Sequence, residues 1–203
     1  MHAFARSRDA GQTPRLLEAH LLLLAQGLAQ GTQRVTGYPY RAPHGLSPAG
    51  GRLDAFLRPL GHTIDHTDST RRYAYSTDLV PWFPGKAAGG GHDLKPTAAE
   101  IEACWSWFER EVEIAEPRAV VLLGREAASS FLRRYVTGER RVRQSSLEGL
   151  AGSLYPATLA GHKTPAIVVW HPSSAWGRYS AAAARTYAAG QEALRPIVIA
   201  GAP

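Results

Sequence analysis

The fold of this chain is decided by the stretch Ile167-Val168-Val169-Trp170-His171-Pro172-Ser173-Ser174-Ala175-Trp176. It begins with β-branched apolar residues, which are typical of a buried strand. The strand ends at the His-Pro-Ser turn, and an alanine-rich segment with a helical pattern follows at residues 177–194. Ligands of open α/β sheets bind just beyond the carboxyl ends of the strands. The stretch therefore predicts a sheet edge at which His171 faces a ligand.

Apolar runs elsewhere in the chain alternate with segments of helical pattern. Buried strands are predicted at residues 21–25 and 119–123, a further strand at residues 73–80, and an edge strand within residues 153–159. Helices are predicted at residues 14–20, at residues 52–60, after a capping box of Thr97 and Glu100, and after Gly124. This alternation predicts an α/β fold with a mainly parallel sheet and helices on both faces.

The composition favours a polyanionic partner. Lys and Arg number 23 against 17 Asp and Glu, a net charge of +6, which suits nucleic acid and equally suits a basic soluble protein. The single cysteine, Cys104, excludes an internal disulfide and a cysteine-rich metal site. No apolar run approaches the roughly 18 residues of a membrane span, and no secretory signal is recognised. The expected location is the cytoplasm, with nucleoid association if the source is bacterial.

The length predicts a single domain over residues 1–203, with residues 1–13 as a flexible N-terminal segment. His44, His62 and His66 do not have the spacing of a metal motif and are interpreted as surface histidines, so no metal is expected. Trp105 and Trp107 are interpreted as core packing. A flexible basic loop is predicted at residues 137–149, where its arginines either contact phosphates or remain solvated.

Three predicted strand ends carry polar or glycine-rich motifs in a recognisable order. Gly27-Leu28-Ala29-Gln30-Gly31 comes first, Thr77-Asp78 second and His171-Pro172-Ser173 third. Their order and spacing resemble the uracil-DNA glycosylase superfamily, especially the branch of families 4 and 5, whose first motif reads Gly-Glu-Ala-Pro-Gly or Gly-Leu-Ala-Pro-Ala. The resemblance covers residues 21–179. Further matching pieces are Gly37-Tyr38-Pro39-Tyr40, Gly50-Gly51-Arg52-Leu53-Asp54, residues 97–104, and Val121-Leu122-Leu123-Gly124.

The resemblance implies a three-layer α/β/α fold with a central, mainly parallel four-stranded sheet. It also implies base excision repair, in which a deaminated base (uracil or a relative) is flipped out of DNA and its N-glycosidic bond is hydrolysed. His171 stands where the family has a donor to the base oxygen O2, which stabilises the charge on the leaving base. Tyr40 stands in the place of the aromatic residue that stacks on the base, and Asp78 in that of the asparagine that reads the base edge.

The same resemblance assigns the remaining contacts. The backbone and side chains of Gly27, Leu28, Ala29, Gln30 and Gly31 would line the base. Contacts to DNA fall to Ser173, Ser174, Ala175, Trp176 and Arg178, and Trp176 is the expected wedge that fills the vacated stack.

The chain departs from the family in several places. Cys104 and Trp82 stand at two of the four cluster positions of family 4, so we expect no iron–sulfur cluster and no cofactor. Leu28 and Ala29 leave the first motif without a carboxylate, and Gln30 replaces its proline. Asp78 replaces asparagine, and an ionised carboxylate only accepts hydrogen bonds.

Four interpretations of Asp78 remain open at this stage. It is protonated through burial, it reads an amino-bearing edge like that of cytosine, it activates water as a general base, or it caps a neighbouring segment in an inactive pocket. The first hypothesis for the whole chain is a monomeric glycosylase whose partner is damaged DNA and not a membrane. The alternatives are a weak or inactive glycosylase-like protein that binds DNA lesions and, third, a nucleoside or nucleotide hydrolase.

Overall fold

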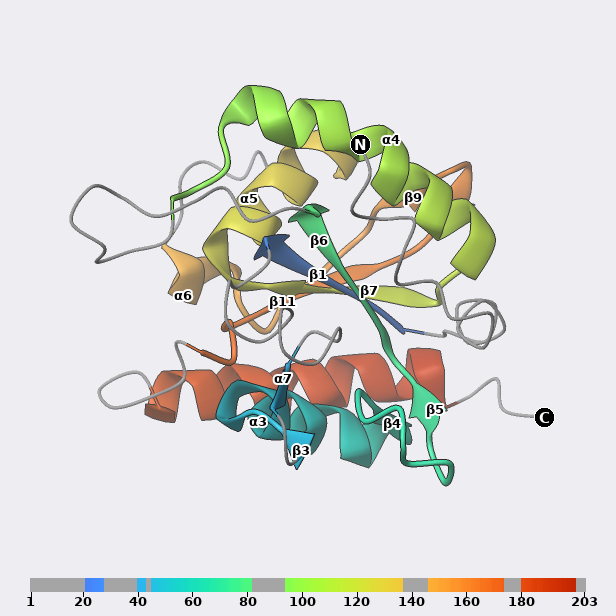
Figure 1. Ribbon diagram of the computed structural model, residues 1–203, viewed down its shortest axis with the longest axis vertical. Helices are drawn as coiled ribbons and strands as arrows, with labels where there is room; N and C mark the ends of the chain where they lie inside the picture. Colours follow the sequence, from blue (N-terminus) through green and yellow to red (C-terminus); the bar gives the residue numbers. More distant parts are fainter. Residues whose placement is uncertain are drawn as a thin grey trace.

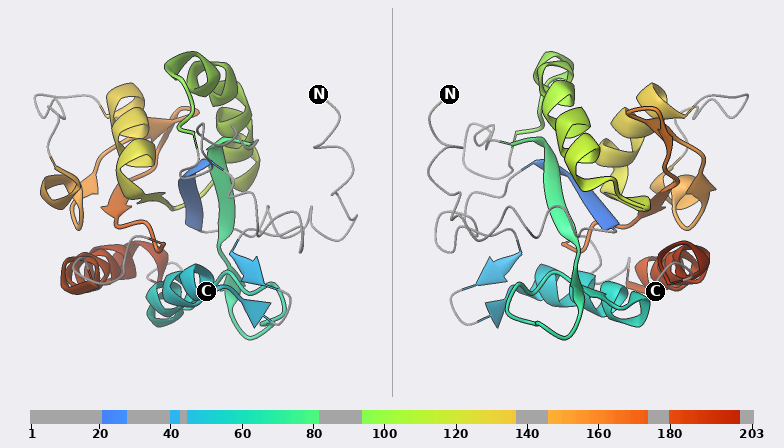
Figure 2. Two further views of the ribbon diagram at one scale, coloured as in Figure 1. Left: turned by 60° about the vertical axis from the view of Figure 1, so that its left-hand side comes forward. Right: turned by 90° about the vertical axis from the view of Figure 1, so that its right-hand side faces the viewer.

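The computed structural model describes residues 21–27, 40–42, 45–81, 94–136, 146–173 and 180–199. A central sheet lies between two layers of helices (Figure 1). Helices α4 (Ala98–Ala115) and α5 (Gly124–Tyr135) cover one face, and α3 (Pro48–Leu57) and α7 (Ser180–Val198) cover the other. Figure 2 shows these two helical layers on opposite sides of the strands. The predicted three-layer α/β/α fold is confirmed.

The sheet has the order β6-β1-β7-β11-β8. Its strands are β1 (Leu21–Gly27), β6 (Tyr75–Val80), β7 (Ala119–Leu123), β11 (Ala166–Val169) and β8 (Leu154–Tyr155). The first four strands in this order run parallel. The short strand β8 adds a fifth, antiparallel member beside β11, within the segment predicted as an edge strand. The four-stranded parallel core is therefore as expected, and β8 extends it.

The apolar runs form strands because both faces of the sheet are covered. In β1, Leu22 and Leu24 pack in the layer of α4 and α5, whereas Leu21, Leu23 and Ala25 pack in the layer of α3 and α7. Neighbouring residues of a strand point to opposite faces, so a strand buried on both sides contains no obligatory polar position. Polar residues that could bind or react with a ligand are therefore expected at the ends of the strands.

The smaller elements connect these layers. The hairpin β2 (Arg41–Ala42) with β3 (Gly45–Leu46) precedes α3, and β4 (His62–Thr63) pairs in parallel with β5 (Arg72–Tyr73) after the 3₁₀ turn η2 (Arg58–Leu60). Helix α6 (Leu147–Leu150) and the antiparallel pair β9 (Thr158–Leu159) and β10 (His162–Lys163) complete the described elements. None of the described helices is long and apolar enough to cross a membrane.

Several predicted boundaries were wrong. Helix α3 begins at Pro48 rather than at residue 52, because the Ser47 side chain accepts the Gly50 N–H and Pro48 suits the first turn. The strand predicted at residues 73–80 is divided at Ala74 between β5 and β6. Helix α7 runs through Pro196 to Val198, which is buried and prolongs the apolar stripe beyond residue 194. Residues 14–20 and 137–145 lie outside the described part.

Two side chains are placed differently from the prediction. His62 is only 1% exposed, and its Nδ1 lies 2.7 Å from the Leu60 carbonyl oxygen, so it is a core histidine. Trp105 is buried as expected, but Trp107 is 59% exposed because the helical spacing turns it away from the stripe of Cys104, Trp105, Phe108 and Val112. The capping box of Thr97 and Glu100 is confirmed.

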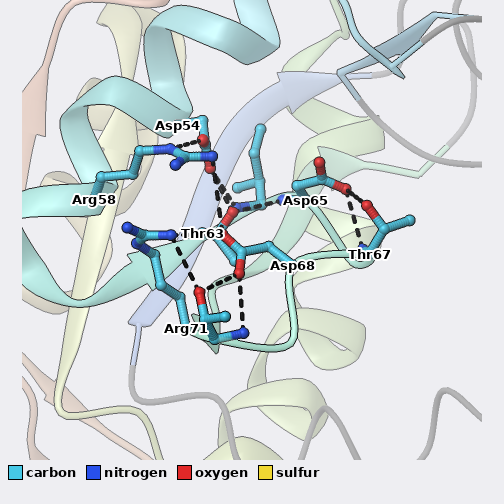
Figure 3. Close-up of polar contacts among 9 residues, drawn as sticks. Asp54, Arg58, Thr63, Asp65, Thr67, Asp68 and Arg71 are labelled. Carbon is cyan, nitrogen blue, oxygen red and sulfur yellow. Dashed lines mark hydrogen bonds and ion pairs between the residues drawn. The ribbon is translucent and has the colours of Figure 1, made fainter.

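Helix α3 is anchored to the following loop by Asp54, a carboxylate that is 3% exposed (Figure 3). Its Oδ1 accepts the Thr63 hydroxyl at 2.5 Å and the Ile64 N–H at 3.2 Å, and its Oδ2 accepts Arg58 Nε at 2.5 Å. These bonds satisfy a buried charge with three donors, one from η2 and two from the segment after it. The loop after β4 is therefore fixed to the helix that carries part of the site.

We expect Asp54→Ala to lower the free energy of unfolding by about 2–4 kcal/mol, because the Thr63 hydroxyl and the Ile64 N–H would be buried without their acceptor. Denaturant unfolding measures this loss. Asp54→Asn keeps an oxygen for Thr63 and should lose less. Equal stability of Asp54→Ala and the parent would contradict the anchoring role.

Candidate active site

The carboxyl ends of the parallel strands meet at one edge of the sheet. Gly27 at the end of β1 is aligned with Val80 at the end of β6, and Leu123 of β7 is aligned with Val169 of β11. Asp78 lies near the carboxyl end of β6, opposite Ala25 of β1. His171 follows the end of β11. The edge predicted from the sequence is therefore present, and it brings together residues from distant parts of the chain.

Three predicted site residues, Tyr40, Asp78 and His171, converge on the same side of this edge, and we call them the trio. Asp78 pairs with Ala25, which faces the layer of α3 and α7, and Tyr40 packs against the same layer. The rings of Tyr40 and His171 have their centroids 6.3 Å apart. Burial and then the Asp78 carboxyl raise the pKa of the Tyr40 hydroxyl above its usual range, which places Tyr40 within electrostatic reach of Asp78.

The hydrogen bonds of His171 determine which ring nitrogen carries the proton. The Ser173 backbone N–H donates to Nδ1 at 3.2 Å, and Ser173 Oγ lies 2.6 Å from the same nitrogen. Because a backbone N–H can only donate, Nδ1 is an acceptor, and the neutral ring holds its proton on Nε2. Burial, followed by the Arg52 guanidinium, lowers the pKa of His171 to about 4. Near neutral pH the ring is thus an uncharged donor through Nε2.

Two residues that the sequence analysis did not single out hold the turn around His171. Arg52 of α3 donates through Nε to the Pro172 carbonyl oxygen at 2.6 Å. Tyr187 of α7 donates its hydroxyl to the Trp170 carbonyl oxygen at 3.1 Å, and its ring packs on Phe56. Arg52 belongs to a motif named in the sequence analysis, but its contact with Pro172 joins positions 120 residues apart and could not be predicted from the motif. No local sequence pattern indicates the role of Tyr187.

Two glycines allow the backbone to approach the site closely. Gly124 has φ +84°, and a Cβ on it would lie 3.0 Å from His171 Cβ. A Cβ on Gly50 would lie 2.3 Å from the Tyr40 carbonyl oxygen, which accepts the Ser47 N–H at 2.7 Å. Tyr40 itself has φ +63°, an uncommon conformation for a residue with a side chain. The first turn of α3 therefore fixes the backbone of Tyr40.

A second carboxylate, Glu111 of α4, lies across strand β6 from Asp78. Its Oε1 accepts the Tyr75 hydroxyl at 3.0 Å and its Oε2 accepts the Thr77 hydroxyl at 2.6 Å. Burial, and then the charge of Glu111, raise the pKa of Asp78 to about 7. Glu111 falls on a helix with a regular apolar stripe, and nothing in its local sequence indicates this contact.

The remaining predicted residues divide into two groups. Ser173 is exposed and sits against the His171 ring, which gives it a role in orienting that ring besides its predicted contact to DNA. Most of the first motif and of the DNA segment lies outside the described residues: Leu28, Ala29, Gln30, Gly31, Ser174, Ala175, Trp176 and Arg178. His44 and Trp82 also lie outside them.

The chemistry of the described side chains gives no support for a metal centre. Across the described ranges, no three His, Cys, Asp or Glu side chains are grouped so that they could hold a metal ion. Cys104 is buried, and burial raises the pKa of its thiol.

Comparison with known proteins defines the class. A sequence model of the uracil DNA glycosylase superfamily matches residues 11–195. The chain belongs to this superfamily, whose proteins act on DNA. A search of curated proteins gives no match. Among solved structures, the crystal structure of wild-type SMUG2 from Pedobacter heparinus is similar, with a TM-score of 0.53 and 13% identity over 88% of this chain and 75% of that chain. At this identity the similarity shows a common fold.

Adjacent glycines of α3 provide a matched test of the Tyr40 contact. We expect Gly50→Ala to destabilise the protein by about 1–3 kcal/mol, because its methyl group collides with the Tyr40 carbonyl. Gly51→Ala meets nothing within 4 Å and should stabilise the helix by up to about 1 kcal/mol. Denaturant unfolding of both variants measures the difference. A gain in stability from Gly50→Ala would contradict the close approach.

The raised pKa of Asp78 makes stability depend on pH. The folded chain keeps a proton on Asp78 up to about pH 7, whereas an unfolded aspartate loses it near 3.8. Between these values the folded state binds more protons than the unfolded state, so stability falls as the pH rises. We expect Asp78→Asn to raise the melting temperature by about 5 °C at pH 8 and to have no such effect below about pH 4. A gain of the same size at both pH values would argue against this linkage.

Proposed function

We propose that this chain is a DNA glycosylase that hydrolyses the N-glycosidic bond of a deaminated base, uracil or a related one, flipped out of DNA during base excision repair. The observation that carries this proposal is the uncharged His171 ring with Nδ1 engaged by Ser173, which leaves Nε2–H as a donor on a ring whose centroid lies 6.3 Å from that of Tyr40. The net charge of +6 favours binding to the phosphate backbone.

The reaction needs a group that stabilises the departing base. As the bond between sugar and base breaks, its electron pair moves onto the base, and in uracil negative charge builds on the base oxygen O2. The Nε2–H of His171 donates to that oxygen, and an uncharged donor held by fixed backbone contacts requires no rearrangement as the charge develops. Tyr40 stacks on the base, and water then adds to the sugar carbon.

Residues Ser173, Ser174, Ala175, Trp176 and Arg178 are the proposed contacts to DNA. They follow the His171 turn directly in sequence, so they reach the strand next to the flipped nucleotide. Trp176 is the proposed wedge, since an aromatic face replaces the stacking that the flipped base gives up.

We expect the parent protein to release free base from duplexes that contain uracil, hypoxanthine or xanthine. His171→Ala should lower the single-turnover rate by about 10²–10³-fold, because it removes the donor to the developing charge. His162→Ala, which changes an exposed histidine of β10, is the matched control and should keep the parent rate. Absence of release from all three duplexes would overturn the proposed activity.

A second candidate is a protein that binds lesions without cutting them. It is favoured by the lack of a carboxylate at Leu28 and Ala29 and by aspartate in place of asparagine at position 78. Lesion-specific binding without formation of an abasic site would identify this function.

A further inference from the structure

We propose that Asp78 determines base recognition as an uncharged carboxylic acid, kept in that form by its burial and by Glu111 across strand β6, and that it reads bases in which a ring N–H lies next to a carbonyl oxygen. Such edges belong to uracil, hypoxanthine and xanthine, the products of deamination. This inference rests on the proposed function and gives its substrates a chemical definition.

The geometry of strand β6 places the two carboxyl groups on opposite faces. Thr77 donates to Glu111 Oε2 at 2.6 Å, so its side chain faces α4. Asp78 is the next residue, and the alternation of the strand turns it to the other face, where Ala25 and Tyr40 lie. Glu111 cannot swing away easily, because Tyr75 also holds its Oε1 at 3.0 Å. A fixed negative charge therefore lies behind Asp78.

The other described groups near Asp78 are neutral or interact with other residues. Tyr40, from the segment before β2, is a neutral phenol, and His171, after β11, is a neutral ring. Arg52 of α3 is the nearby cation, and it acts on His171 and Tyr187. Among the residues that the structure describes, no side chain forms a hydrogen bond or an ion pair with the Asp78 carboxyl. Burial, and then the like charge of Glu111, favour the protonated acid and raise the pKa of Asp78 to about 7.

An uncharged carboxylic acid can replace the amide of asparagine. Its hydroxyl donates to a base carbonyl while its own carbonyl accepts the ring N–H, which is the pattern that an amide offers. The ionised form only accepts, so it meets the base carbonyl with repulsion. The rate at which these bases are excised should therefore be proportional to the protonated fraction of Asp78. Glu111 is a positioning residue in this scheme, because it acts through Asp78 and does not touch the base.

The test is the pH profile of single-turnover uracil excision between pH 5.5 and 8.5. In the parent the rate should fall as the pH rises above about 7, approaching tenfold per pH unit once Asp78 is ionised. Asp78→Asn should remove the fall and exceed the parent by about thirtyfold at pH 8.5, one and a half pH units above the pKa of Asp78. Glu111→Gln removes the charge, keeps one acceptor oxygen for a hydroxyl and can donate its N–H to the oxygen of the other, and it should move the fall to lower pH by about half a unit or more. Glu113→Gln, an exposed change on the same helix, should leave the profile unchanged.

Two results would overturn the inference. A rate that rises with pH and is lost in Asp78→Asn would make Asp78 a base that activates water. A profile that neither Asp78→Asn nor Glu111→Gln alters would remove both residues from base recognition. Carbon-13 NMR of the aspartate carboxyl groups gives a direct reading: one signal should titrate near pH 7 in the parent, be absent in Asp78→Asn, and titrate at lower pH in Glu111→Gln.

Failure of the proposed function would be seen separately. If the parent releases no base at any pH, binding is measured to a duplex with 2′-fluorinated deoxyuridine, whose glycosidic bond resists cleavage, against an undamaged duplex. A preference for the lesion that weakens above about pH 7 in the parent but not in Asp78→Asn would support recognition by Asp78 without catalysis. A preference that is independent of pH, or no preference, would overturn the inference as well.

Discussion

The position of His171 depends on the two carbonyl groups that flank it in the chain. The Trp170 carbonyl accepts a hydrogen bond from Tyr187 of α7, and the Pro172 carbonyl accepts one from Arg52 of α3. The ring itself is oriented by Ser173, and the Cβ of His171 lies close to Gly124 at the start of α5. Helices from the same layer thus define where the imidazole lies, and they do so through backbone atoms.

Complete burial of the sheet explains why all the chemistry lies at its edge. The parallel strands β1, β7 and β11 are apolar along their buried lengths, since helices cover both faces. Strand β6 differs because it is the outermost strand beside β1, and it contains the consecutive polar residues Ser76, Thr77 and Asp78. Its one face presents Tyr75 and Thr77 to Glu111, and its other face presents Asp78 to the site. Two carboxyl groups can interact there without being in contact.

The sequence was sufficient to predict the parts of the fold that depend on local patterns. The apolar runs predicted the parallel strands, and the capping box of Thr97 and Glu100 predicted the start of α4. The ordered motifs identified His171, Asp78 and Tyr40, which the structure brings together. The start of α3 was missed because paired glycines are poor helix formers, yet Gly50 is needed there for the approach of Tyr40.

The contacts that orient the trio were not predictable in this way. Tyr187 and Glu111 lie on helices whose local sequence shows only amphipathic spacing, and their partners are distant in the chain. Arg52 was part of a recognised motif, but only the folded chain reveals that its target is a carbonyl beside His171. His62 was assigned to the surface because a histidine without a metal pattern gives no local indication of burial.

The two bonds that flank His171 have an evolutionary consequence. Each joins a specific side chain to a main-chain oxygen, and every amino acid has such an oxygen. As far as these bonds are concerned, mutational drift is tolerated at positions 170 and 172 but not at positions 52 and 187. Residues remote in sequence from the histidine should therefore be under stronger purifying selection than its immediate neighbours.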